Sequence, residues 1–227
     1  GVHWQDGTDT GAITYTVGLG SGWLVAWIDF NDGGTFAGTD EMIISQAAAA
    51  ADGATTVTFD VPAGTINAGA ATTLNARFRL FDSEPDFPAL AFFGAAGNGE
   101  VEDYQWILGS IGNLVWADTN ADGIKDGGES GIENVTVALY HDADGSGTIN
   151  GGDTLLQTVT TDANGAYDFS GVLAGNYLVD VTDTNNVLTG LVVTGGSDPF
   201  PVALTAGEVV EDADFGYAAP PPGNLSK

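Results

Sequence analysis

Residues 113–141 read NLVWADTNADGIKDGGESGIENVTVALYH, and this stretch decides the fold class. Two apolar segments, 113–117 and 135–141, flank a loop composed largely of Asp, Asn, Gly and Glu. Both segments are short and rich in β-branched and aromatic residues, which favours strands over helices. The stretch therefore predicts two β-strands joined by a polar, turn-forming loop.

The same alternation of apolar segments and turn residues extends along the whole chain. No long helix is expected, because the alanine-rich stretch 46–53 is too short to be stable by itself and favours a surface turn of helix or an ordered loop. The pattern predicts an all-β protein of two tandem β-sandwich domains, Ig-like or jelly-roll-like. The further strand candidates begin at Ala12, Trp23, Thr55, Leu74, Glu100, Leu155, Ala166, Asn176, Leu191 and Asp212.

A domain boundary is expected near Gly109, where the strand-like EVEDYQWIL ends and the small-residue linker GSIG begins. The chain of 227 residues suits two domains of about 100 residues each. The terminal AAPPPGNLSK has the composition of a polyproline spacer. We expect one domain over 1–108, a second over 109–218, and a Pro-rich linker or arm over 219–227.

The composition excludes several classes of function. With 31 acidic side chains against 4 basic ones and a formal charge of -27, the chain cannot neutralise phosphates, so neither nucleic acid nor polybasic membrane docking is expected. No apolar run is long enough for membrane insertion. The absence of cysteine excludes disulfides and thiolate sites. Since 43% of residues are hydrophobic, the acidity does not predict disorder.

The loop 118–129, DTNADGIKDGGE, matches the calcium-loop pattern D-x-[DN]-x-[DN]-G-x5-E at every specified position. Its spacing gives the oxygen-only shell that Ca2+ prefers, with a glycine at position six for the sharp turn; Mg2+ fits such a cage poorly. The alternative is a solvated turn between strands, which a full match disfavours. The expected ligands are Asp118, Asn120, Asp122, the Ile124 carbonyl, Asp126 and Glu129.

A second loop of the same length, DADGSGTINGGD at 142–153, follows the pattern less closely. Serine at position five is a weaker ligand and aspartate at position twelve reaches less far than glutamate, so a lower affinity or a bound water is expected. Both loops join β segments, which makes a regulatory EF-hand switch improbable. The expected ligands are Asp142, Asp144, Ser146, Thr148, Asn150 and Asp153.

Two further positions are weaker candidates. The loop after WIDF offers Asp29, Asn31 and Asp40, but Gly33 occupies position five, so a plain hairpin loop and a calcium site are equally supported. Asp162 precedes Asn164-Gly165, a strong two-residue turn signal, and is expected to form a turn first and to ligate calcium second.

At two places the sequence resembles known families. LVWADTNADGIKDGGESGIENVTVALY (114–140), TVTTDANGAYDFSGVLAGNYLVDV (158–181) and ADFGYAAP (213–220) resemble the calcium-binding B domain of serine-aspartate-repeat (SdrD-type) bacterial surface proteins. WLVAWIDFNDGGTF (23–36), TLNARFRLF (73–81) and GNGEVEDYQWIL (97–108) resemble the GEVED domain of secreted bacterial proteins, although Gly33 stands where that pattern usually has an acid.

These resemblances imply secretion and a rod-like or stalk-forming role. They also imply calcium as a structural staple. The implied ligands are Asp118, Asn120, Asp122, Asp126 and Glu129.

Alternation along the strand places Glu100 and Glu102 on one face and Asp103 on the other. These acids could form an acid/base pair or a metal site. Arg77 and Arg79 lie on another strand candidate, so an ion-pair ladder between strands is the simpler interpretation.

We expect no enzyme. His3 and His141 are isolated and are expected at the surface, and no nucleophile motif occurs. Carboxylate pairs are abundant, but no single pair stands out as a glycosidase site. The tryptophans could line a sugar platform, but Trp23 and Trp27 share a strand face with Val25, which favours core packing.

The expected function is mechanical: a calcium-stabilised extracellular protein at the bacterial cell surface. It would be a rigid module of a stalk or the repeating subunit of a fibre assembled by strand donation, with the N-terminal stretch or AAPPPGNLSK as the donated arm. The expected partners are calcium, neighbouring domains and other copies of the chain. An adhesin or carbohydrate-binding module that takes glycans is the alternative, and accessory domains of a secreted enzyme are a weaker one.

Overall fold

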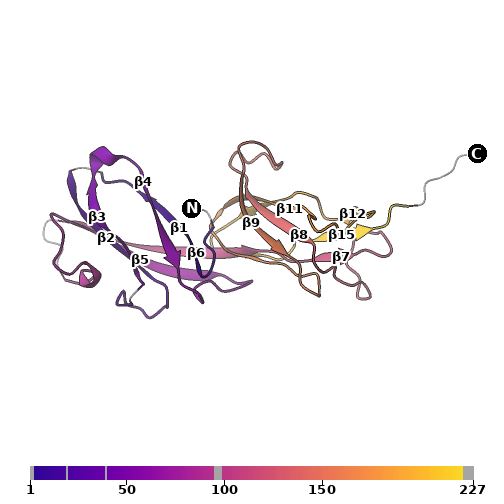
Figure 1. Cartoon of the computed structure of the whole chain (residues 1–227), viewed down its shortest axis with the longest axis horizontal. Helices are drawn as coiled ribbons and strands as arrows, with labels where there is room; N and C mark the ends of the chain where they lie inside the picture. Colours follow the sequence, from indigo (N-terminus) through magenta and orange to yellow (C-terminus); the bar gives the residue numbers. More distant parts are fainter. Residues whose placement is uncertain (1–2, 19, 39, 95–98, 222–227) are drawn as a thin grey trace, which may run out of the picture. The chain divides into compact units, whose positions relative to one another are not determined.

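The computed structural model describes residues 3–18, 20–38, 40–94 and 99–221 (Figure 1). Apart from two 3-10 turns, η1 (Ala50–Asp52) and η2 (Pro88–Leu90), the regular structure of these residues is β-strand, which confirms the all-β prediction. No helix within the described ranges is long and apolar enough to span a bilayer. Of the expected arm 219–227, residues 222–227 lie outside the described residues.

The chain divides into two compact units. Unit 1 comprises Gly1–Asn67, Ala71–Leu108 and Gly171–Leu173, and unit 2 comprises Ala68–Ala70, Gly109–Ser170 and Ala174–Lys227.

Unit 1 contains two antiparallel sheets. The smaller sheet pairs β1 (Thr8–Tyr15) with β4 (Thr55–Val61). The larger sheet has the order β6-β5-β2-β3, and β10 (Phe169–Val172) joins it beside β6. Its strands are β2 (Ser21–Asp29), β3 (Met42–Ala49), β5 (Thr72–Phe81) and β6 (Val101–Ile111).

The core of unit 1 lies between these sheets, and β2 is buried on both of its faces. Leu24 and Ile28 belong to the core cluster, whereas Trp27 on the opposite face is also fully buried, as core packing predicts. The 88–94 segment covers this second face, because Phe92 packs edge-on against Trp27 with ring centroids 6.1 Å apart.

Arg79 fastens this covering segment to the sheet. Its side chain is only 2% exposed, and its guanidinium donates hydrogen bonds to the carbonyls of Ala91, Phe93 and Gly94. Burial and the neighbouring Arg77 lower the pKa of Arg79.

Unit 2 also contains two sheets. One has the order β13-β11-β8-β9 and is antiparallel; the other has the order β12-β15-β7, in which β15 and β7 run parallel. A short strand, β14 (Val209–Val210), pairs in parallel with Ser110 and Ile111. The strands are β7 (Val115–Ala117), β8 (Thr136–His141), β9 (Thr154–Thr160), β11 (Gly175–Val181), β12 (Val192–Gly195), β13 (Phe200–Leu204) and β15 (Phe215–Ala218).

The structure corrects several local expectations. Residues 46–49 are the end of β3 rather than a helical turn, because Ala47, Ala48 and Ala49 pair with β2, and only η1 after them is helical. Three strands, β3, β13 and β14, were not expected from the sequence, and the strand expected from Ala166 begins at Phe169.

Two predictions about charged and polar side chains also change. His3 is 6% exposed and therefore buried, whereas a surface position was expected. Of the ion pairs expected between strands, Arg77 forms one with Asp103 at 2.7 Å. Arg79 instead donates hydrogen bonds to backbone carbonyls.

Candidate metal centre

Loop 118–129 directly follows β7, and both of its ends are fixed to the sheet. The Asp118 N–H donates to the Tyr217 carbonyl at 2.9 Å, and the Ala117 N–H donates to the Ser130 carbonyl at 2.9 Å. A Cβ atom on Gly123 would lie 2.7 Å from the Thr194 carbonyl, so glycine is required where the loop packs against β12. Local chain geometry therefore holds the loop in place.

The side chains of this loop form two hydrogen-bonded groups, one around Asn120 and one around Glu129. Asn120 donates from its amide to Asp122 and to Asp126, each at 3.0 Å. Glu129 is 9% exposed and accepts the Thr119 N–H at 2.6 Å and the Asp126 N–H at 3.0 Å. These backbone hydrogen bonds, that of Asp126 first, lower the pKa of Glu129 and keep it ionised.

Loop 142–153 connects β8 to β9 and gathers its acids more closely. Carboxylate oxygens of Asp142, Asp144 and Asp153 all lie within 4.8 Å of one another, a grouping of three acids that loop 118–129 does not show within the described part of the chain. From the sequence, loop 118–129 is the stronger candidate calcium site, because it matches the pattern at every specified position.

An amide nitrogen occupies the middle of the 142–153 loop. Asn150 Nδ2 donates to Asp144 at 3.1 Å, to Ser146 Oγ at 3.0 Å and to the Thr148 carbonyl at 3.3 Å. These three oxygens belong to positions three, five and seven of the calcium-loop pattern. The Asn150 amide thus draws together three oxygens that would also be available to a cation.

The two loops share one backbone design. In each, the carboxylate of the first Asp accepts N–H groups four and five residues later, at 2.8–3.2 Å. Positions four and six of each loop have positive φ. They are Ala121 (58°) with Gly123 (77°), and Gly145 (67°) with Gly147 (70°).

The loop after β2 follows the same design with a different final acid. Asp29 accepts the Gly33 and Gly34 N–H groups at 3.0 and 2.9 Å. The Asn31 amide donates to Glu41 at 2.7 Å; Glu41 is 3% exposed, whereas Asp40 is exposed. The loop is one residue longer than the pattern, so the twelfth position falls on Asp40 whereas Asn31 contacts Glu41. Burial and the Asp29 charge raise the pKa of Glu41.

Asp162 forms a turn, as expected. Its carboxylate accepts the Asn164 N–H at 2.7 Å and the Ala166 N–H at 2.9 Å, and these bonds lower its pKa. It is not part of the three-acid group.

The donor sets of loops 118–129 and 142–153 fit a hard divalent cation, because each loop presents carboxylate, amide or hydroxyl and carbonyl oxygens without nitrogen or sulfur ligands. Such an ion, when bound, would neutralise the acids and cross-link the loop. Asp142 lies at the end of β8 and Asp153 at the start of β9, so a shared ion would tie these strands together.

Comparisons with known proteins match two different families to the two halves of the chain. Residues 23–107 match the family model of the GEVED domain, and residues 109–200 match that of the SdrD B-like domain. "Bone sialoprotein-binding protein" and "Serine-aspartate repeat-containing protein E", both of Staphylococcus aureus, are 37% identical over 105 residues, which is 46% of this chain. The chain spans only 8% of the length of these relatives.

Two similar solved structures are pilins. GBS52, the minor pilin of Streptococcus agalactiae, has a TM-score of 0.38 and 13% identity, covering 92% of this chain and 87% of its own. Domains D2 and D3 of the major pilin SpaD from Corynebacterium diphtheriae have a TM-score of 0.37 and 12% identity, covering 96% of this chain and 90% of their own. Motifs and family models together identify residues 23–107 as a GEVED domain and residues 109–200 as an SdrD B-like domain, in the order that the sequence predicts.

Proposed function

We propose that this chain is a calcium-stabilised structural module of an extracellular bacterial surface protein and that it has no catalytic role. The observation that carries the proposal is the gathering of Asp142, Asp144 and Asp153 within 4.8 Å in a loop joining two adjacent strands. The SdrD B-like match supports calcium as the ion. The names of the matched staphylococcal proteins support a surface location.

The physical role of calcium follows from the charge of the chain. Close carboxylates repel one another in a protein of net charge -27, and a divalent cation converts this repulsion into attraction. The unfolded chain has no preformed cage, so binding energy adds to the free energy of unfolding. In this role the acids stiffen loops and do not catalyse a reaction.

Metal analysis with melting curves tests this proposal. We expect calcium to co-purify with the protein and the melting temperature of unit 2 to fall by roughly 10–20 °C in chelator. Magnesium at the same concentration should restore little of the loss. Absence of calcium together with identical melting curves in calcium and chelator would refute the proposal.

The same module can serve in a stalk or as a subunit of a fibre assembled by strand donation. For donation, His3 and Trp4 are poor candidates, because both are buried in unit 1 and the Trp4 N–H donates to the Gly171 carbonyl at 2.9 Å. The segment after Ala218 is the better candidate arm, since β15 ends there. Electron microscopy of the protein with calcium distinguishes the two forms: filaments indicate a subunit, and monodisperse particles at high concentration indicate a stalk module.

A further inference from the structure

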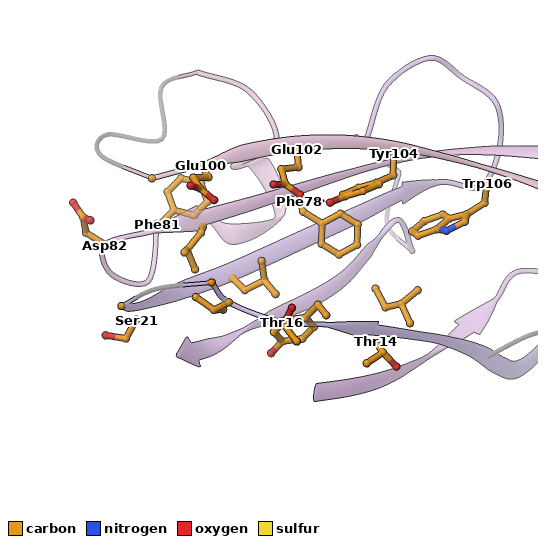
Figure 2. A pocket seen from close by; sticks show the side chains of 18 residues that line it. Thr14, Thr16, Ser21, Phe78, Phe81, Asp82, Glu100, Glu102, Tyr104 and Trp106 are labelled. Atoms are coloured by element: carbon orange, nitrogen blue, oxygen red, sulfur yellow. Dashed lines mark hydrogen bonds between the residues drawn. The ribbon is translucent and has the colours of Figure 1, made fainter. Parts of the chain in front are cut away.

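Unit 1 contains a cavity of about 810 Å3 between β1 and the β5–β6 side of the larger sheet (Figure 2). Each residue from Ile13 to Gly18 lines it. Ile13, Thr14 and Tyr15 are the last residues of β1, and neighbouring residues of a strand point to opposite faces. A cavity that touches all three therefore meets the edge of the strand as well as one face. Among the described strands β1 pairs with β4 alone, so no strand flanks its other side. The cavity is therefore an open groove bordered by a strand edge.

One wall of the groove is aromatic. The Tyr104 and Trp106 rings are nearly parallel, at 14° with centroids 6.4 Å apart, and Phe78 stands edge-on to Tyr104 at 5.4 Å. Figure 2 shows these three side chains on the β5–β6 wall, across from Thr14 and Thr16. Tyr104 is 47% exposed. A large aromatic surface thus remains open to a ligand.

The aromatic wall carries acids at one end. Glu100 and Glu102 lie on the same face of the chain as Tyr104 and Trp106, and all four line the groove together with Asp82. Glu102 accepts a hydrogen bond from the Tyr104 hydroxyl. None of the lining residues is Lys, Arg or His.

The nearest arginines do not offset this charge. Arg77 and Arg79 alternate with Phe78 and therefore point to the opposite face of β5. There Arg77 pairs with Asp103. A cleft with low-dielectric walls and charge of one sign focuses the field and attracts counter-ions.

We propose that this groove binds an extended basic segment of a partner protein. Lys or Arg stems would lie on the aromatic wall, where cations are attracted to ring faces. Their charged ends would reach Glu100 and Glu102, and the partner's backbone would run along the β1 edge as an added strand. A second copy of this chain is a poor occupant, because its net charge of -27 repels an acidic groove. The proposal does not depend on calcium.

Isothermal titration of the full chain with three blocked pentapeptides tests the proposal: Val-Lys-Val-Lys-Val, its Gln analogue and its Glu analogue. We expect the Lys peptide to bind, the other two not to bind, and added salt to weaken the binding. The double variant E100Q/E102Q should weaken it on the order of tenfold. Tyr104→Leu should weaken it with the acids intact.

Asp60→Asn is the matched control, because it removes a charge from an exposed position of unit 1 outside the groove. Circular dichroism and melting curves verify that each variant is folded. Failure of the Lys peptide to bind, equal binding of the Gln peptide, or an equal loss in D60N would overturn the proposal. Tighter binding of a neutral oligosaccharide such as cellohexaose than of the Lys peptide would overturn it in favour of a glycan.

Discussion

Asp144→Asn provides a sharp test of the calcium proposal, because its effect on the melting temperature should depend on calcium. Asp144 lies within 4.8 Å of both Asp142 and Asp153, so neutralising it removes two of the three close carboxylate pairs. One oxygen of Asp144 accepts the Ser146 N–H at 3.0 Å, and the isosteric Asn retains this acceptor. The other oxygen of Asp144 accepts the Asn150 amide at 3.1 Å, and Asn lacks this second acceptor. In chelator this loss opposes the relief of repulsion, so the variant should melt close to the parent.

With calcium the variant should melt clearly below the parent. At a free calcium concentration 100 times the dissociation constant, one site contributes about 2.7 kcal/mol, which raises the melting temperature of a domain of about 100 residues by roughly 10–20 °C. A charged ligand replaced by a neutral one weakens the site. A tenfold weaker site at the same calcium concentration retains about half of this gain. The melting temperatures of the parent and the variant should therefore diverge as calcium increases.

Differential scanning calorimetry over a calcium titration measures both effects. Glu133→Gln is the matched control, because it removes an exposed charge of unit 2 outside both loops and should shift the curves equally with and without calcium. A calcium-dependent rise in melting temperature that is as large in D144N as in the parent would refute the reasoning.

Three further predictions concern stability. Burial, followed by the charge of Asp198 and a hydrogen bond with it, raises the pKa of Asp180 above its ordinary value of 3.8, so the folded state retains a proton that the unfolded chain releases. The free energy of unfolding should therefore fall as pH rises through the interval between the two pKa values. Asp180→Asn should lack this component in melting curves measured from neutral pH to about pH 4. Arg79→Met removes the donors that hold the 91–94 carbonyls, so limited proteolysis should cut this segment faster than in the parent, and unchanged cleavage would contradict the assigned role. Gly165→Ala forces a side chain onto φ of 78° and places Cβ 2.2 Å from the Val115 carbonyl, so chemical denaturation should show a loss on the order of 2–4 kcal/mol.

The sequence predicted the fold wherever apolar alternation was strong. It failed at β3, where Ala47–Ala49 favour helix intrinsically but lie opposite Trp23 and Ser21 on β2, and pairing overrides local preference. It also missed β13, whose Pro201 argues against a strand. Pairing with β2 and β11 stabilises β3 and β13 as strands, and these partner strands lie outside the local sequence.

The two candidate metal loops were predicted from spacing alone, because the expected ligands of each lie within twelve residues of sequence. Spacing could not rank them, since how closely the carboxylates approach depends on side-chain geometry. It also misassigned the loop after β2: Asp40 occupies the twelfth position, but the longer loop brings Glu41 to Asn31 instead. The aromatic groove had only one sequence signal, the alternation of Glu100, Glu102, Tyr104 and Trp106, and its opposite wall comes from β1, almost a hundred residues away.

The parallel pairing of β7 with β15 has a consequence for tensile load. These are the first and last strands of the three-stranded sheet of unit 2 along the chain, and Phe215, Gly216 and Tyr217 lie beside Val115, Trp116 and Ala117. A pull applied where the chain enters β7 and where it leaves β15 drags the two strands in opposite directions along their length. The hydrogen bonds between the two strands are then loaded in shear and must break together, whereas a pull perpendicular to the strands would break them one after another.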